Sequence, residues 1–371
     1  GRARNTAVHY DPATKQIEGV PMCNGMHHLM FSVNQKDLYF SGGGSVNGSS
    51  VVSWIDIDAW DKTKDPKESV GWCPMVLDTN STTPSKVAAL NEVVITPDRT
   101  QWNEPARRAG ANDPEAGSGA GATVPATPFD TKKDTHVNGG LYGIDADISD
   151  GSMWFVKTSP FPSGIVRFHP GTNPPETCRT EFFEPTKLQD GKSYEAFNGR
   201  GMSVDSKGVA WVAFANGRLG KLDRSKCKVL SGPASATGQH CPEGWSYFDT
   251  PGPKYAGVVG GSADFHYLMW VDLYDTLGFG KDVPIVAGSN SDSLLAFDQK
   301  TEKWNVMRVP YPRSFHTRGM DGRFDDVSKG WKGKGVMATY ASQPVWHQEG
   351  GEDASGPQLV KFQVRPDPLA Y

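Results

Sequence analysis

Short strand patterns that repeat along the chain are the feature that most constrains its fold. In one clear copy, residues 202–204, 209–214 and 218–223 form three short segments that are apolar or alternate in polarity, as β-strands do. The turns between them, residues 205–208 and 216–217, both end in glycine, which accepts the positive φ angles of tight hairpins. A sheet this small buries one face and leaves a free edge, so it needs copies of itself beside it.

Copies of this three-stranded pattern are present elsewhere in the chain. Asn-Gly stands just before the first strand of three of them, at Asn24, Asn138 and Asn198, where it suits a turn with positive φ. A strand toward the outer side of the repeat recurs six times, at residues 7–12, 52–58, 164–170, 217–223, 293–298 and 359–364. Six such strands at roughly blade-length spacing predict an all-β fold, a β-propeller of six or seven four-stranded blades.

The repeats predict one propeller domain over residues 1–371, either complete or part of a longer protein, because the chain begins inside a strand. Near-complete repeats begin close to residues 24, 138, 198, 262 and 313. Residues 80–136 interrupt them with a stretch rich in Pro, Gly, Ala, Ser and Thr. This segment lacks the apolar residues for a core of its own, so we expect a low-complexity loop inserted into the propeller.

Charge and hydropathy argue against two classes of partner. The formal net charge of −4 gives no basic surface of the kind that binds nucleic acid. No apolar run in the sequence approaches the length of a membrane-spanning helix. We therefore expect the partner to be either a small-molecule ligand or another protein.

Five cysteines are present, and four of them are placed for two disulfides. Cys227 and Cys241 flank a loop rich in Gly, Ser, Pro and Ala. Cys23 and Cys73 flank one blade repeat, and Cys178 is left over. Disulfides persist in oxidising compartments, so these pairs predict a periplasmic or secreted protein. The alternative is that all five are buried, reduced thiols.

The first residues of successive inner strands converge on the axis of a propeller, so side chains far apart in sequence meet at the mouth of its channel. The repeat places eight polar side chains there: His27, His28, Tyr142, Arg200, Asp264, His266, His316 and Arg318. Glu195, in the loop before Asn198, reaches the same mouth as a second carboxylate.

This polar ring has three interpretations. Its members can satisfy one another by hydrogen bonding, which is a purely structural role. They can form an anion site, in which Arg200 and Arg318 bind a carboxylate and a histidine acts as general base. Finally, histidine nitrogens from different blades, together with Asp264, can hold one divalent metal ion, Mg²⁺ or Ca²⁺.

Two of the repeats resemble a known family. Residues 143–145 read Gly-Ile-Asp, residues 150–155 read Asp-Gly-Ser-Met-Trp-Phe, and residues 164–168 read Gly-Ile-Val-Arg-Phe. This pattern is similar to the blade repeat of the virginiamycin B (streptogramin) lyase family, and residues 200–212 fit it as well. The resemblance covers most of residues 138–225 and extends loosely to the repeats on either side.

The resemblance implies a divalent metal and a His/Glu cluster at the channel mouth, where a base abstracts a proton next to a carbonyl and an ester linkage is eliminated. Asp264-Phe-His266 is the nearest match to the family's Glu-x-His motif, and one of His27 and His28 occupies the family's histidine position. The carboxylate that ends the family's Trp-Phe-x-Glu motif is absent, because Lys157 and Phe214 stand in its place.

These observations favour an exported enzyme, a metal-assisted lyase or hydrolase that acts on a small carbonyl-containing compound. Its predicted catalytic residues are His28, Asp264, His266 and His316, and its predicted substrate-binding residues are His27, Tyr142, Glu195, Arg200 and Arg318. The predicted metal ligands are His28, Asp264 and His266. The alternative is a non-catalytic binding or scaffold propeller in a larger protein or complex.

Overall fold

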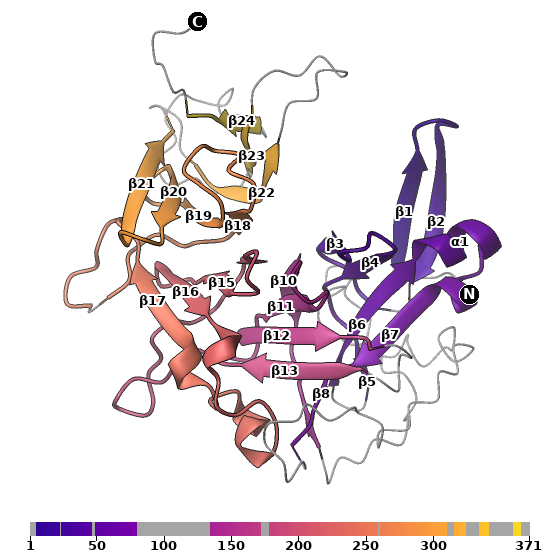
Figure 1. The fold of residues 1–371 in the computed structure, drawn as a ribbon, viewed down its shortest axis with the longest axis horizontal. Helices are drawn as coiled ribbons and strands as arrows, with labels where there is room; N and C mark the ends of the chain where they lie inside the picture. The colour runs from indigo at the N-terminus through magenta and orange to yellow at the C-terminus, as the bar shows by residue number, and fades with distance from the viewer. Residues whose placement is uncertain are drawn as a thin grey trace, which may run out of the picture. The chain divides into compact units, whose positions relative to one another are not determined.

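A computed structural model describes residues 5–22, 24–46, 49–79, 134–171, 178–258, 260–309, 315–323, 334–340 and 359–364. The chain separates into two units. Unit 1 comprises Gly1–Lys187 and Lys226–Glu243, and unit 2 comprises Leu188–Ser225 and Gly244–Tyr371. Within each unit, the repeating element is an antiparallel sheet of short strands (Figure 1).

The first sheet of unit 1 matches the repeat predicted from residue 24. Its strands are β3 (Leu29–Phe31), β4 (Asp37–Phe40), β5 (Ser45–Val46), β6 (Ser49–Asp56) and β7 (Val70–Pro74). β3, β4, β6 and β7 pair in that order, each antiparallel to the next. The strand expected at residues 52–58 stops at Asp56, whose side chain accepts a hydrogen bond from the Ala59 amide. This N-cap begins a helix that the sequence reading missed, α1 (Ile57–Thr63), and α2 (Pro66–Ser69) follows it.

The second sheet of unit 1 contains β10 (Leu141–Ala146), β11 (Met153–Lys157), β12 (Gly164–His169) and β13 (Arg179–Phe183), paired in chain order. β8 (Val76–Leu77) adds parallel to β13, and β9 (Thr135–His136) pairs antiparallel with β8. The last two residues of the predicted insertion are therefore a strand of this sheet. Residues 80–133 lie outside the described part of the chain.

A two-stranded hairpin precedes the first sheet. β1 (Asn5–Asp11) and β2 (Gln16–Met22) pair antiparallel from Asn5 opposite Met22 to Asp11 opposite Gln16. Val20 and Met22 are buried in a cluster with Phe40, Ile55, Trp60 and Val70. Alternation along the strand thus packs one face of the hairpin onto the neighbouring sheet of unit 1.

Unit 2 holds three sheets, each paired in chain order. The first contains β14 (Met202–Val204), β15 (Ala210–Ala213), β16 (Arg218–Leu222) and β17 (Trp245–Asp249). The second contains β18 (Met269–Asp272), β19 (Val283–Gly288), β20 (Ser293–Asp298) and β21 (Lys303–Arg308), and the third contains β22 (Thr317–Arg323), β23 (Gly335–Tyr340) and β24 (Leu359–Phe362). β14 to β16 confirm the three strands read from residues 202–223, and Gly208 and Gly217 take φ angles of 77° and 70°.

Large apolar side chains fill the space between neighbouring sheets of each unit. In unit 1, Met153, Phe155 and Val166 are completely buried in one cluster with Phe182. In unit 2, Trp211, Leu219 and Phe297 are buried in another. Each such side chain stabilises the fold by about 1.5–3 kcal/mol when removed from water, so the sheets of a unit hold together chiefly through these aromatic and aliphatic layers.

These sheets are the blades of a β-propeller, and the described residues form five of them together with the β1–β2 hairpin. The predicted all-β propeller is confirmed, but the predicted count of six or seven blades is not. Five of the six strands predicted toward the outer side are third in their blades, and β7, β13, β17 and β21 lie outside four of them. The remaining one, at residues 7–12, belongs to the β1–β2 hairpin. Among the described residues, no helix is long and apolar enough to cross a membrane.

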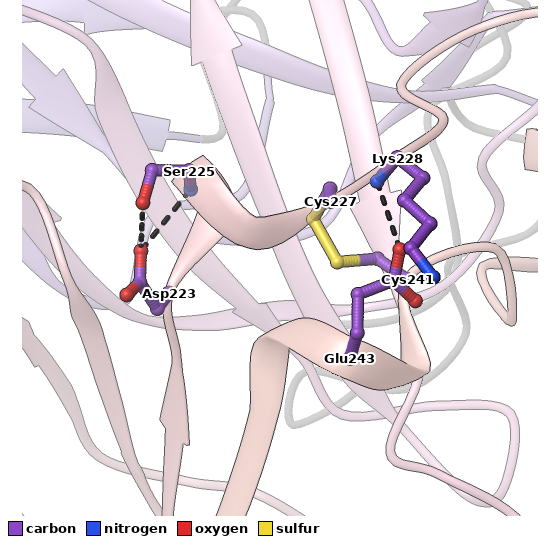
Figure 2. Close-up of a disulfide and its surroundings, with 6 residues drawn as sticks. All are labelled: Asp223, Ser225, Cys227, Lys228, Cys241 and Glu243. Atoms are coloured by element: carbon purple, nitrogen blue, oxygen red, sulfur yellow. Dashed lines mark hydrogen bonds between the residues drawn. A yellow bond between two sulfur atoms is a disulfide. The ribbon is translucent and has the colours of Figure 1, made fainter.

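One predicted disulfide is confirmed and the other is corrected. Cys227 and Cys241 are bonded, with Cα atoms 4.9 Å apart, and they close a loop that the Lys228 amide also ties to Glu243 (Figure 2). Cys73, however, pairs with Cys178 rather than with Cys23, which lies outside the described residues. The reason is that β8, just after Cys73, pairs with β13, just after Cys178, a long-range pairing that no local pattern reveals.

Candidate functional site

Asp264, a predicted catalytic residue, lies completely buried just before the inner strand β18 of unit 2. Its Oδ1 accepts hydrogen bonds from the Asn290 and Ser291 amides at 2.7 and 2.8 Å, and its Oδ2 accepts one from Ser291 Oγ at 2.9 Å. A β-carbon at Gly252 would collide with the same carboxylate. Asp264 therefore anchors the turn between β19 and β20 to the start of β18.

His266 is equally buried, and both of its ring nitrogens are hydrogen bonded. Burial lowers the pKa of His266, so the imidazole is neutral. In this form, Nδ1 donates to the Ala287 carbonyl at 2.8 Å, and Nε2 lies within hydrogen-bond distance of Thr250 Oγ1, at 3.0 Å. His266 thus ties β19 and the end of β17 to the start of β18.

His266 does not fit a metal centre. A metal ligand must offer a lone pair toward the ion, whereas both nitrogens of His266 already serve protein groups. Over the described ranges of the chain, no three His, Cys, Asp or Glu side chains gather as a metal ion requires. The divalent ion and its predicted ligands stay a prediction, and no chemical step is derived from them.

A second group at the inner strands of unit 2 is more open. Arg318, at the start of β22, is exposed, and its guanidinium carbon lies 5.3 Å from the centre of the Tyr267 ring. The half-buried His316 meets the same ring edge-on at 5.4 Å, and Phe265 meets it at 5.8 Å. Burial and the charge of Arg318 lower the pKa of His316. We call Phe265, Tyr267, His316 and Arg318 the aromatic–arginine cluster.

The other two predicted site residues of unit 2 have different surroundings. Arg200 is half-buried just before β14, where its amide donates to the Ala213 carbonyl at 3.1 Å. Glu195 is ion-paired with Arg218, which also reaches Asp249 at 2.8 Å. That three-residue network joins the loop before β14 to β16 and β17, so the Glu195 carboxylate already has a protein partner.

The remaining predicted residues form a cluster of rings in unit 1. His27 and His28 stack with their centroids 4.6 Å apart, and Tyr142 at the start of β10 lies 4.4 and 4.5 Å from them. The His27 amide donates to the Ser41 carbonyl at 2.7 Å, and the Ser41 amide donates to the His28 carbonyl at 2.9 Å. These two bonds hold the segment in place. Nε2 of His28 is buried and has no hydrogen-bond partner among the described residues. Burial, then the neighbouring His27, lowers the pKa of His28 to about 4.

Sequence reasoning missed two participants of these groups. Tyr267 contacts the other three members of the aromatic–arginine cluster. The only local indication of this role in the sequence was its position directly after His266. Arg218 holds Glu195, although its place on a strand of alternating polarity gave no sign of that partner. Both contacts join segments whose spacing in the sequence carries no information about distance.

Comparison with known proteins adds a likeness in fold. No family model and no curated protein matches this sequence. Among solved structures, a streptogramin B lyase is similar at 10% identity and a TM-score of 0.46, covering 98% of this chain and 78% of the lyase. Virginiamycin B lyase from Staphylococcus aureus is similar at 9% identity and a TM-score of 0.39, with 90% and 84% covered. Kuenenia stuttgartiensis hydrazine synthase is similar at 10% identity and a TM-score of 0.41, with 82% and 65% covered.

The resemblance to streptogramin lyase-like propellers that the repeats indicated is confirmed in this sense, since structures of those lyases are among the matches. With TM-scores below 0.5 and identities near 10%, these likenesses carry no argument about activity. The fold assignment rests on the blades themselves, and function must be argued from the side chains.

Proposed function

We propose that the aromatic–arginine cluster of unit 2 binds a small carboxylate compound that also carries an apolar or aromatic group. The observation that carries the proposal is the exposed Arg318 guanidinium lying 5.3 Å over the Tyr267 ring. A guanidinium binds a carboxylate with two parallel charge-assisted hydrogen bonds, and an aromatic face beside it offers apolar contact.

The topology supports the same proposal. Arg200, Tyr267 and Arg318 stand at the starts of β14, β18 and β22. β14 lies beside β18, and β18 lies beside β22, so three neighbouring inner strands of one unit present these side chains at the same end. Two guanidinium groups at that end give a second cation for a ligand with more than one acidic group.

Benzoate is a suitable first probe, because it combines a carboxylate with one ring. Titration of the whole chain by calorimetry is expected to detect benzoate binding but no binding of benzyl alcohol, which lacks the charge. Arg318→Ala is expected to weaken benzoate binding about tenfold or more, as expected for loss of a charge-assisted hydrogen bond. Equal affinity of the wild type and Arg318→Ala for benzoate would refute the site.

A lyase or hydrolase that acts on a bound carbonyl compound is the second candidate, favoured by His316. Its lowered pKa keeps the imidazole neutral near pH 7, the form that accepts a proton as general base. We expect His316→Gln to abolish turnover of a carboxylate ester substrate while weakening benzoate binding much less than Arg318→Ala does. If no ester or lactone is turned over by the wild type, the propeller is the non-catalytic binding module.

We further propose that the protein is exported. Two disulfides are formed, Cys73–Cys178 and Cys227–Cys241, and such bonds persist in oxidising compartments. Mass spectrometry of protein isolated from its native cells under alkylating conditions is the test. Alkylated cysteines at all four positions would contradict export, whereas protected cysteines at all four positions would support it.

A further inference from the structure

A lysine ends one of the apolar rows of unit 1. Met153 and Phe155 on β11 point into the buried cluster that also contains Phe182, and alternation along the strand places Lys157 on the same face. Lys157 pairs with Leu141 on β10 and with Gly164 on β12. The side-chain amine of Lys157 therefore occupies a position at which the pattern of the row predicts another apolar side chain.

The Lys157 side chain is 4% exposed, and its Nζ lies 4.8 Å from the centre of the Phe182 ring. Among the described residues, Nζ makes no hydrogen bond and has no carboxylate within ion-pair distance. A lysine is almost never this buried without a partner. Burial lowers its pKa, which enriches the neutral, nucleophilic amine.

A carboxyl group faces the same edge of the sheet. Glu184 directly follows β13, and its charge raises the pKa of Lys157 against the larger effect of burial. Burial raises the pKa of Glu184, while a hydrogen bond from Gln239 Nε2 at 3.1 Å holds its Oε2. Gly164, the β12 partner of Lys157, leaves room for the Phe182 ring, which a β-carbon at this position would strike.

We propose that Lys157 is a reactive amine that forms an imine with small aldehydes, with the Glu184 carboxyl group as the proton donor. The near-complete burial of the lysine restricts the reactant to compounds of a few heavy atoms. This site belongs to unit 1 and is independent of the carboxylate site proposed for unit 2.

The reaction is a condensation without an oxidant or reductant. The neutral Lys157 nitrogen attacks the aldehyde carbon, a C–N bond forms, and one amine proton passes to the former carbonyl oxygen. Glu184, in its protonated form, then gives its proton to that hydroxyl group, the C–O bond breaks and water leaves. The remaining proton on nitrogen returns to the Glu184 carboxylate, so an imine and one water are the products.

Reductive methylation of the whole protein measures this step directly, because formaldehyde must first form the imine that dimethylamine–borane then reduces. Lys221 is the matched control, since its Nζ lies 5.1 Å over the Trp211 ring on β16 but its side chain is only half-buried. Peptide mass mapping at about pH 7 is expected to show Lys157 labelled severalfold faster than Lys221, with the difference narrowing as the pH approaches the ordinary lysine pKa of about 10.4.

Slower labelling of Lys157 than of Lys221 across this pH range, or labelling only after unfolding in urea, would overturn the proposal. Lys157→Met continues the apolar row with an apolar side chain and is expected to stay folded. Loss of the label in this variant assigns the labelled peptide to Lys157. Glu184→Gln is expected to slow labelling of Lys157 severalfold and to leave Lys221 unchanged. An unchanged rate at Lys157 in Glu184→Gln would remove Glu184 from the reaction.

Discussion

Two polar groups at the inner strands of this propeller have opposite surroundings, although the repeat assigns them equivalent positions. Asp264 and His266, before β18 in unit 2, are completely buried and every side-chain polar atom has a protein partner. His28, before β3 in unit 1, is only partly buried, and its Nε2 has no hydrogen-bond partner among the described residues. Position in the repeat therefore does not decide chemical role.

Hydrogen-bond satisfaction separates the two groups more clearly than residue type does. A buried carboxylate with three donors stabilises its neighbours, and its removal leaves those donors unpaired. By contrast, His28 Nε2 has no hydrogen-bond partner among the described residues, and Arg318 is exposed beside the Tyr267 ring. Three measurements test this difference between the two groups.

The largest effect is expected for Asp264→Ala. This change leaves the Asn290 and Ser291 amides without an acceptor in a buried site, so we expect a loss of about 3 kcal/mol or more in the free energy of unfolding. Urea denaturation measures it. Asp264→Asn retains one acceptor oxygen for the two amides and is expected to lose distinctly less. Wild-type stability in Asp264→Ala would show that the network is not structural.

An intermediate effect is expected from the titration of His28. Its pKa is about 4 in the folded protein and 6.5 when unperturbed, so the unfolded state binds more protons between these values. The contribution of neutral His28 to the free energy of unfolding is therefore complete above pH 6.5 and is lost as the pH falls toward 4. Because His28 is partly solvated, we expect about 1–2 kcal/mol.

Urea denaturation of the wild type and His28→Asn at several pH values tests this titration. The difference between the two proteins is expected to change in this window and to be constant above it. An NMR titration midpoint of His28 near its ordinary value would contradict the assigned environment.

The smallest effect on stability is expected for Arg318→Ala. Arg318 is exposed, and its contact with Tyr267 is a cation–π interaction, worth about 0.5–1 kcal/mol at such a site. The midpoint temperature of thermal unfolding should therefore change by only a few degrees. A loss comparable to that of Asp264→Ala would place Arg318 in the framework of the blade rather than in a ligand site.

Much of the blade architecture was predictable because it depends on local sequence patterns. The strands from Met202 to Leu222 and the positive φ of Asn198 and Gly217 follow from alternation and turn residues only a few positions apart. The closed loop between Cys227 and Cys241 is local in the same sense.

The site was predictable only in part, because its chemistry depends on contacts between distant segments. His266 looks like a ligand in sequence, but its role depends on the Ala287 carbonyl and Thr250. The sequence suggests that the Glu195 carboxylate can bind a ligand, but in the structure it is ion-paired with Arg218. The Cys73–Cys178 bond spans 105 residues, and no local rule selects that partner over Cys23.

The most direct test of the division between framework and site is a paired measurement on Asp264→Asn and Arg318→Ala. Benzoate affinity and the free energy of unfolding are determined for both variants and the wild type. We predict that Arg318→Ala loses benzoate affinity and keeps its stability, whereas Asp264→Asn keeps benzoate affinity and loses stability. The reverse pattern, with benzoate affinity lost only in Asp264→Asn, would contradict the division and return Asp264 to the centre of the functional site.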